Sequence, residues 1–162
     1  MALDENTSLV VIYLQECSSD GTPHFNSANK PVLVPILVPE PREYSGTTST
    51  VVDSTRNAKA VLIGSIVRDD MAKVSMSWNY LKVNEYSLLL RCFKQNTIIN
   101  LGNDNYCLGN FMPMVKFFDL TSGEYVTRQM YPGDRTSKMW RRNPSTLEVM
   151  GWTDCKFNLI EV

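Results

Sequence analysis

The segment from Thr55 to Phe93 constrains the fold of this 162-residue chain most strongly, because the spacing of its apolar residues changes once. Two parts of it alternate apolar with small or polar residues, as strands with one solvent-facing side do. The apolar residues of these parts are Val61, Ile63, Val67, Val74, Met76 and Trp78. Residues 68–70 between them predict a turn. After Asn79 the apolar spacing becomes three or four residues, which predicts a helix over about 83–94 packed on the sheet.

Further runs with strand character lie near both ends of the chain. The apolar run Leu9 to Leu14 predicts either a strand or one buried helical turn. A short strand over Thr97 to Leu101 is expected inside a polar loop of residues 94–110. The last ten residues alternate again, which predicts a closing strand. One face of that strand would carry Cys155, Phe157 and Leu159.

The sequence from Met114 to Arg135 predicts a hairpin followed by a sharp bend. The runs Met114 to Phe118 and Tyr125 to Tyr131 flank Gly123, which can take the positive φ that such turns use. The bend is expected at residues 131–135, Tyr-Pro-Gly-Asp-Arg. About six or seven strands and one helix, without regular alternation of the two, predict an α+β or mainly β domain. An antiparallel β-sandwich or barrel with one packed helix is therefore expected over residues 1–162 as a single domain.

Four prolines interrupt the apolar sequence that precedes this core. They are Pro31, Pro35, Pro39 and Pro41. Because proline cannot donate a backbone hydrogen bond, they exclude a central strand and predict an extended edge arm over residues 31–44. The arm would lie on the core or on a neighbouring subunit. Residues 1–35 would form an N-terminal extension, and residues 50–162 the β core with its helix.

The charge balance excludes a strongly basic surface for the whole chain. There are 16 Lys and Arg against 17 Asp and Glu, so neither sequence-specific nucleic-acid binding nor a membrane partner is expected. No apolar run reaches the roughly 18 residues of a membrane span, and the acidic N-terminal sequence differs from a secretory signal. We therefore expect a cytosolic protein. Residues 1–20 carry four acids and no base, whereas residues 116–142 carry six bases and three acids, so the two regions could meet between subunits.

The four cysteines are scattered and form no Cys-x-x-Cys pair. They are Cys17, Cys92, Cys107 and Cys155. The chain has one histidine, and it does not stand at ligand spacing to any of them. We expect buried free thiols of a reducing compartment, and neither a metal site nor a cofactor.

A search for catalytic patterns gives no enzyme. His24 is the only histidine, lies in a polar loop and is not part of a nucleophile-and-base motif, so a surface position is expected. The acids Asp69, Asp70, Asp119 and Glu124 lie in predicted turns, where Asp satisfies the local backbone. The spacing from Gly102 to Gly109 does not match a phosphate-binding loop.

Five aromatic residues offer a platform for a sugar or a peptide, although strand aromatics more often fill a core. They are Trp78, Tyr125, Tyr131, Trp140 and Trp152. Trp140 differs from the others because it stands in the polar segment 136–145, between Lys138 and Arg141. That context favours an interface.

Several motifs together resemble a family of small tail proteins from siphophages and from prophages of Gram-positive bacteria. The motifs are Val38 to Tyr44, Asp53, Arg56 to Ala58, Lys73 to Trp78, the Leu-Leu-Leu-Arg-Cys-Phe end of the helix, Tyr131 to Arg135, and the closing Cys155 to Val162. The resemblance covers about residues 36–162. It implies a β-sandwich or barrel flanked by a helix, as in tail-tube and distal tail proteins. Residues 1–35 and 94–110 are longer and more polar than in that family, so the position along the tail stays open.

These observations lead to the hypothesis of a structural virion protein, located in the tail of a long-tailed bacteriophage and assembled in the cytoplasm of its host. It would form a ring in or next to the tail tube, a hexamer being one option, with neighbouring tail proteins as further partners. A distal tail or baseplate hub component is the first alternative. The second is a monomeric module that binds carbohydrate or peptide through Trp140, Tyr131 and the basic segment 116–142. The residues expected at the oligomer interface are Pro35, Pro39, Tyr44, Phe118, Val126, Tyr131 and Trp140.

Overall fold

The computed structural model describes residues 5–56 and 62–162 and shows a mainly β protein with one short helix in them. The predicted fold class is confirmed, but the described residues form nine strands rather than six or seven. The strands are β1 (Val11–Cys17), β2 (Leu33–Leu37), β3 (Glu43–Arg56), β4 (Leu62–Leu81), β5 (Ile98–Gly102), β6 (Asn105–Leu108), β7 (Met114–Phe118), β8 (Tyr125–Arg142) and β9 (Val149–Glu161). The helix α1 is Val83–Cys92.

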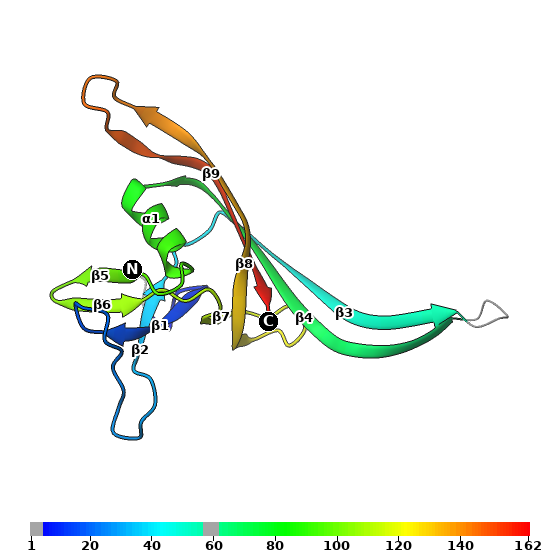
Figure 1. The fold of residues 1–162 in the computed structure, drawn as a ribbon. Coiled ribbons are helices and arrows are strands. Elements are labelled where there is room, and N and C mark those ends of the chain that lie inside the picture. Colours follow the sequence, from blue (N-terminus) through cyan, green and yellow to red (C-terminus); the bar gives the residue numbers. More distant parts are fainter. Residues whose placement is uncertain (1–4, 57–61) are drawn as a thin grey trace.

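All nine strands belong to one antiparallel sheet that stays open and does not close into a barrel. Its order is β3-β4-β9-β8-β7-β1-β6-β5, and β2 pairs with β1 alongside this path. The long strand β8 joins the two halves. Its first residues pair with β7, where Met114 lies opposite Gln129, and its later residues pair with β9, where Met130 lies opposite Glu161. One continuous strand thus serves both halves of a sandwich-like body (Figure 1).

The core forms between the two halves and α1. Val115 comes from the β1–β7 half, and Phe157 from the β4–β9 half. The predicted alternation is confirmed in residues 74–78 of β4 and 155–159 of β9, because the side chains expected to face inward there are all buried: Val74, Met76, Trp78, Cys155, Phe157 and Leu159. The side chains of Ile63 and Val67, expected on the same face, lie outside the described part of the chain. Phe93, which follows α1, lies with its ring 5.3 Å from that of Phe157. The helix therefore closes one side of the core.

The helix begins after Lys82 and ends at Cys92, close to its predicted range. Its first turn is fixed by Glu85, whose carboxylate accepts a hydrogen bond of 3.0 Å from the N–H of Lys82. Of the face predicted from the three-to-four spacing, Tyr86, Leu89 and Phe93 are buried, whereas Val83 is exposed; Cys92, which was not predicted on this face, is also buried.

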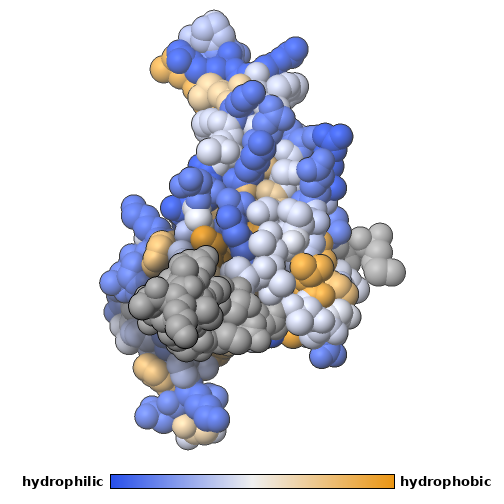
Figure 2. Space-filling model, turned by 90° about the vertical axis from the view of Figure 1, so that its right-hand side faces the viewer, coloured by the Kyte–Doolittle hydropathy of each residue, from blue (hydrophilic) through white to orange (hydrophobic). Residues whose placement is uncertain are grey.

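Three segments extend beyond the body (Figure 1). The β3–β4 arm is the outer part of the hairpin of β3 and β4; it reaches far to one side and curves. The β8–β9 arm, defined as residues 135–153, extends in another direction, and the β1–β2 loop, residues 18–32, projects at the opposite end of the molecule. Figure 2, viewed toward the β3–β4 arm, shows a largely hydrophilic surface with separate hydrophobic patches outside the residues drawn in grey.

The turn predicted at residues 68–70 is wrong, because β4 continues through them as one strand of 20 residues. Its partner β3 runs alongside it, with Val51 opposite Arg68. Register shifts on either side of Val51 absorb the local irregularity as a bulge does. The cross-strand ladder thus outweighs the local turn preference of Asp69 and Asp70. Val61, expected in the first strand, lies outside the described residues.

The bend predicted at Tyr131–Arg135 is also not a turn, since these residues lie inside β8. Pro132 is opposite Leu159 and Arg135 is opposite Phe157, so three steps along β8 match two along β9. The extra residue makes a β-bulge. The same sequence signals that favour a turn, Pro and Gly, are therefore used to bend a paired strand.

The loop expected over residues 94–110 contains a second hairpin made of β5 and β6. Its turn has positive φ at Gly102 (87°), Asn103 (51°) and Asp104 (60°). Gly and Asn favour these values, so the turn signal was present in the sequence although β6 was not predicted. The other short predictions are confirmed: Leu9–Leu14 lies largely in strand β1, β7 and β8 form the hairpin, and the proline-rich arm contains the edge strand β2.

Candidate assembly surfaces

Tyr44, Phe118 and Val126, three of the residues predicted at an interface, lie where the β3–β4 arm leaves the body. The Tyr44 hydroxyl donates a hydrogen bond of 2.6 Å to the carbonyl of Phe118. Burial raises the pKa of Tyr44 to about 12. Phe118 packs edge to face on Tyr125, with ring centres 5.2 Å apart, and both rings stay exposed to solvent by 39% and 50%. Tyr44 and Val126 therefore serve the subunit's own packing, and the Phe118–Tyr125 pair is available to a neighbour.

A charged network fixes β4 beside this point. Asp119 is buried, and its carboxylate lies 3.6 Å from the guanidinium of Arg128. The other end of that guanidinium lies 3.3 Å from Glu161. Glu161 in turn accepts a hydrogen bond of 2.9 Å from the N–H of Ala72 in β4. The root of the β3–β4 arm is thus held to both the β7–β8 turn and the C-terminal strand.

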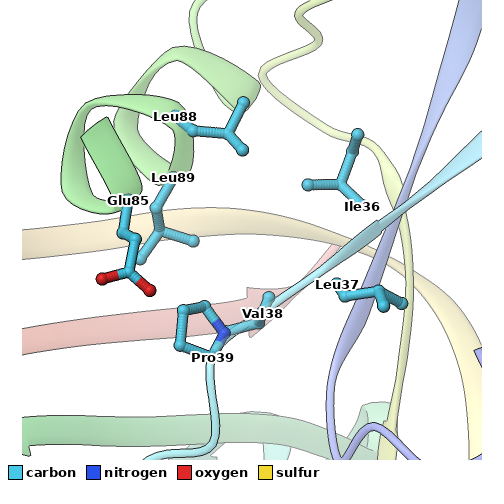
Figure 3. Close-up of a pocket in the computed structure, with 7 residues that line it drawn as sticks. All are labelled: Ile36, Leu37, Val38, Pro39, Glu85, Leu88 and Leu89. Carbon is cyan, nitrogen blue, oxygen red and sulfur yellow. The ribbon is translucent and has the colours of Figure 1, made fainter. Parts of the chain in front are cut away.

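Pro39 packs within the subunit, whereas Pro35 lies in an edge strand and is exposed. Pro35 stands in β2, opposite Tyr13 of β1. The carbonyl of Pro39 accepts a hydrogen bond of 2.9 Å from the indole N–H of Trp78. Figure 3 shows residues 36–39 facing Glu85 and two leucines of α1 across a hollow of about 120 Å³. The proline-rich segment therefore lies on its own core, which was one of the two positions expected for it.

Tyr131 and Trp140 do not share one surface. They lie nine residues apart on β8, which is about 30 Å along a strand. The ring of Tyr131 is 6.2 Å from that of Phe111, whereas Trp140 packs edge to face on Tyr80 at 5.4 Å. Trp140 keeps 47% of its surface exposed. The guanidinium of Arg141 lies 5.1 Å from its ring centre.

A groove between α1 and the β8–β9 arm was not predicted from the sequence. One part of it, about 560 Å³, is lined by Tyr86, Leu90, Arg91, Arg135 and Trp152 among others. A second part of about 570 Å³ continues past Tyr80 to Met150 and shares Val83, Ser87 and Arg91 with the first. These three shared residues recur every four positions, which places them on one face of a helix. This spacing of four residues is the feature of the sequence from which a shared helical face could have been inferred.

The edge of β3 is the longest open edge in the described part of the sheet. β3 stands at one end of the strand order and pairs with β4 on one side only. Its 14 residues include neither lysine nor proline, which are two of the usual means of blocking an edge. Residues 45–49 are exposed serine, glycine and threonine. This edge was not predicted, because the turn expected at residues 68–70 would have ended the hairpin early.

The four cysteines are buried free thiols, as expected. Burial raises the pKa of Cys92 to about 12 and that of Cys107 to about 11. Within residues 5–56 and 62–162 no group of three or more His, Cys, Asp or Glu side chains is arranged to hold a metal ion. The part of the chain that the structure describes contains no helix long and apolar enough to span a membrane.

His24 lies in the β1–β2 loop, as expected, but it has two side-chain partners that were not predicted. One ring nitrogen is 2.7 Å from the Ser18 hydroxyl, and the other is 2.9 Å from the Glu16 carboxylate. Glu16 and His24 are each a little over one third exposed. The sequence signal was the Asp20-Gly21 turn, which folds Thr22 and His24 back along the end of β1.

The chain was also compared with known proteins. No protein-family model matches it, and no curated protein sequence matches it significantly.

Proposed function

We propose that this protein is a structural component of the tail of a long-tailed bacteriophage and assembles into a ring in or next to the tail tube. The observation that carries the proposal is the β3–β4 arm. It extends beyond the body as a long hairpin, and its outer strand presents an open edge (Figure 1).

An open edge of this length favours pairing with another chain. In an antiparallel edge strand every second residue directs its backbone N–H and C=O to the open side, where they can form hydrogen bonds to an added strand. In a closed ring every subunit would supply an edge to one neighbour and cover the edge of the other, so that no edge stays open. Ring assembly therefore accounts for the open edge of the arm, because a neighbouring subunit covers it, whereas in a monomer the edge stays uncovered.

The root of the arm supports the same proposal. Phe118, Leu120 and Tyr125 are exposed there, Leu120 by 61%. Apolar side chains gathered beside an open strand edge are typical of a surface that a partner covers. The Arg128 network holds the root in place, so the arm would be oriented before assembly. Pre-orientation lowers the entropic cost of association.

The resemblance of residues 36–162 to small tail proteins supports the virion context. Under this proposal the partners are further copies of the chain and neighbouring tail proteins, and assembly takes place in the host cytoplasm before the particle is complete. A distal tail or baseplate hub position uses the same edge chemistry and differs only in the neighbours. The groove beside α1 favours the monomeric binding module as a second candidate, because it combines Trp152 with Arg91 and Arg135.

Electron microscopy of purified particles tests the virion context. An antibody fragment against the exposed β1–β2 loop, coupled to gold, should label the tails. Label along the whole tail supports a tail-tube position, and label confined to its far end supports the hub alternative. Particles that carry no label and lack the chain in mass spectrometry would contradict the proposal and favour the binding module.

A further inference from the structure

The ribbon formed at the end of β1 places three reactive side chains on one face. Glu16 and Ser18 are two residues apart along an extended chain, so their side chains point to the same side. The N–H of His24 donates 2.9 Å to the carbonyl of Glu16, and the N–H of Ser18 donates 2.9 Å to the carbonyl of Thr22. His24 is therefore directly opposite Glu16 in this antiparallel ribbon, and its imidazole shares the face.

The distances match a nucleophile, a general base and an orienting acid. The Nε2 atom of His24 lies 2.7 Å from Ser18 Oγ, and its Nδ1 atom lies 2.9 Å from Glu16 Oε1. In the tautomer with hydrogen on Nδ1, the ring donates to the carboxylate and accepts the hydrogen of the Ser18 hydroxyl. This is the hydrogen-bond order of a Ser-His-acid triad, which occurs on unrelated folds and is recognised by its geometry.

The loop that carries these residues is held in place by its own hydrogen bonds. Asp20 accepts from both the N–H (3.0 Å) and the hydroxyl (2.8 Å) of Thr22, and these bonds lower the pKa of Asp20. The N–H of Gly21, at a φ of 91°, donates to the carbonyl of Ser18. The carbonyl of His24 accepts from the side chain of Gln15 at 3.2 Å. The three side chains are thus already arranged before a ligand binds. Such pre-arranged groups favour catalysis because less entropy is lost in the reaction.

A hollow of about 330 Å³ opens beside the three side chains and has room for a small molecule. Its other wall consists of Asp104 in the β5–β6 turn and of Asn105 and Tyr106 at the start of β6. The side-chain amide of Asn105 can donate to an oxyanion that develops on a bound acyl group. The carboxylates of Glu16 and Asp104 line the hollow and make it negative, so a substrate with a positive charge is favoured.

We propose that Ser18, His24 and Glu16 form a catalytic triad that hydrolyses small acyl esters, with cationic aminoacyl esters preferred. Ser18 Oγ bonds to the acyl carbon while its proton passes to His24 Nε2. The ester C–O bond then breaks, and the alcohol leaves with that proton. Water attacks the acyl group on Ser18 and gives a proton to His24, which returns it to Ser18 Oγ as the carboxylic acid is released. Glu16 holds the ring and stabilises its charged form.

This activity goes beyond the proposed assembly function, and it departs from the expectation of a protein without catalytic residues. The test is hydrolysis of p-nitrophenyl acetate by the full chain, with mass spectrometry of peptides from the acylated protein. We expect an acetyl group on Ser18 and a rate that Ser18→Ala and His24→Gln each lower at least 100-fold. Glu16→Gln should lower it about tenfold, and Ser27→Ala, in the same loop, should leave it unchanged.

Equal rates for the wild type and Ser18→Ala, or acetyl groups only on other residues, would overturn the proposal. Thermal melts of Ser18→Ala keep the test valid, because this change removes one partly exposed hydroxyl and should not unfold the chain. The substrate class is tested by comparing alanine p-nitrophenyl ester with p-nitrophenyl hemisuccinate. The cationic ester should have a kcat/KM at least tenfold higher, and Asp104→Asn should narrow the difference; equal values would overturn the stated preference. Since Ser18→Ala should still assemble, failure of the triad and failure of the ring give different results.

Discussion

The two halves of β8 are both paired with neighbouring strands, but they differ in what they cover. In residues 125–132 the pattern alternates and includes the buried Met130 and Pro132. In residues 135–142 only Ser137 is partly buried, and every other side chain is exposed. Ladder hydrogen bonds thus continue where burial stops. Because a two-stranded ribbon is marginal in water by itself, the outer half depends on the body for its stability and is available to a partner.

Trp78→Ala should have the largest effect, because Trp78 of β4 lies in the core to which the inner half of β8 contributes Met130. Trp78 is 4% exposed, and its indole N–H donates to Pro39. Loss of this side chain should lower the free energy of unfolding by about 3–5 kcal/mol. Ser77→Ala, on the opposite face of β4, should change it by less than about 0.5 kcal/mol. Urea unfolding of both variants checks this, and similar losses would mean that the two faces are not distinguished.

Alkaline pH should lower the stability of the body more than that of the arms, because the buried thiols lie in the body. The pKa of Cys92 is raised from 9.0 to about 12 in the folded chain, so the unfolded chain loses this proton first as pH rises. Its contribution to stability is complete below pH 9 and is lost as pH rises toward 12. We expect a decline of about 1–2 kcal/mol between pH 8 and pH 10.5 from this residue.

Urea unfolding at several pH values measures the decline. Cys92→Ala should lower stability at pH 7, since it leaves a cavity, but should flatten the alkaline decline. In addition, a thiol reagent should find four reactive thiols only after denaturation without reductant. An unchanged alkaline slope in Cys92→Ala would show that other groups control it.

Trp140→Ala should have the smallest effect, because it acts in the exposed half of β8. It removes the edge contact with Tyr80 and the stacked Arg141, from a side chain that stays half exposed. The expected loss is about 0.5–1 kcal/mol. Trp140→Phe, which keeps an aromatic ring, is the matched control and should recover most of it. A loss of unfolding free energy as large as that of Trp78→Ala would contradict the stated difference between the buried body and the exposed arm.

The parts of the fold that were predicted are those with one buried face. Val74 and Phe157 lie in strands where burial enforces alternation, and this alternation is visible in the sequence. The outer half of β8 and the exposed part of β3 have solvent on most side chains, so no alternation marks them. The local turn signal of Pro132-Gly133, where the inner half of β8 ends, was misleading because strand pairing between distant segments overrode it.

The same reason limits what could be predicted of the candidate sites. The hydrogen bond from Tyr44 to Phe118 joins residues 74 positions apart, and no sequence pattern marks such a contact. The contact of His24 with Ser18 spans six positions and follows from one tight turn. It was within reach of sequence reasoning, whereas the long-range packing at the root of the arm was not.

The central claim, assembly through the β3–β4 arm, is tested by shortening that arm. Ser49 and Met71 lie opposite each other in the hairpin, so residues 50–70 can be replaced by Asn-Gly, a two-residue turn that suits an antiparallel pair. The root and the core contacts of β4 stay in this variant. His24→Ala, far from the arm, is the control.

Size-exclusion chromatography with light scattering at high protein concentration gives the most direct result. We predict that the wild type and His24→Ala form a ring of defined mass, and that the short-arm variant is a folded monomer with a cooperative unfolding transition. A wild-type protein that stays monomeric at every concentration, or a short-arm variant that forms the same ring, would contradict the account.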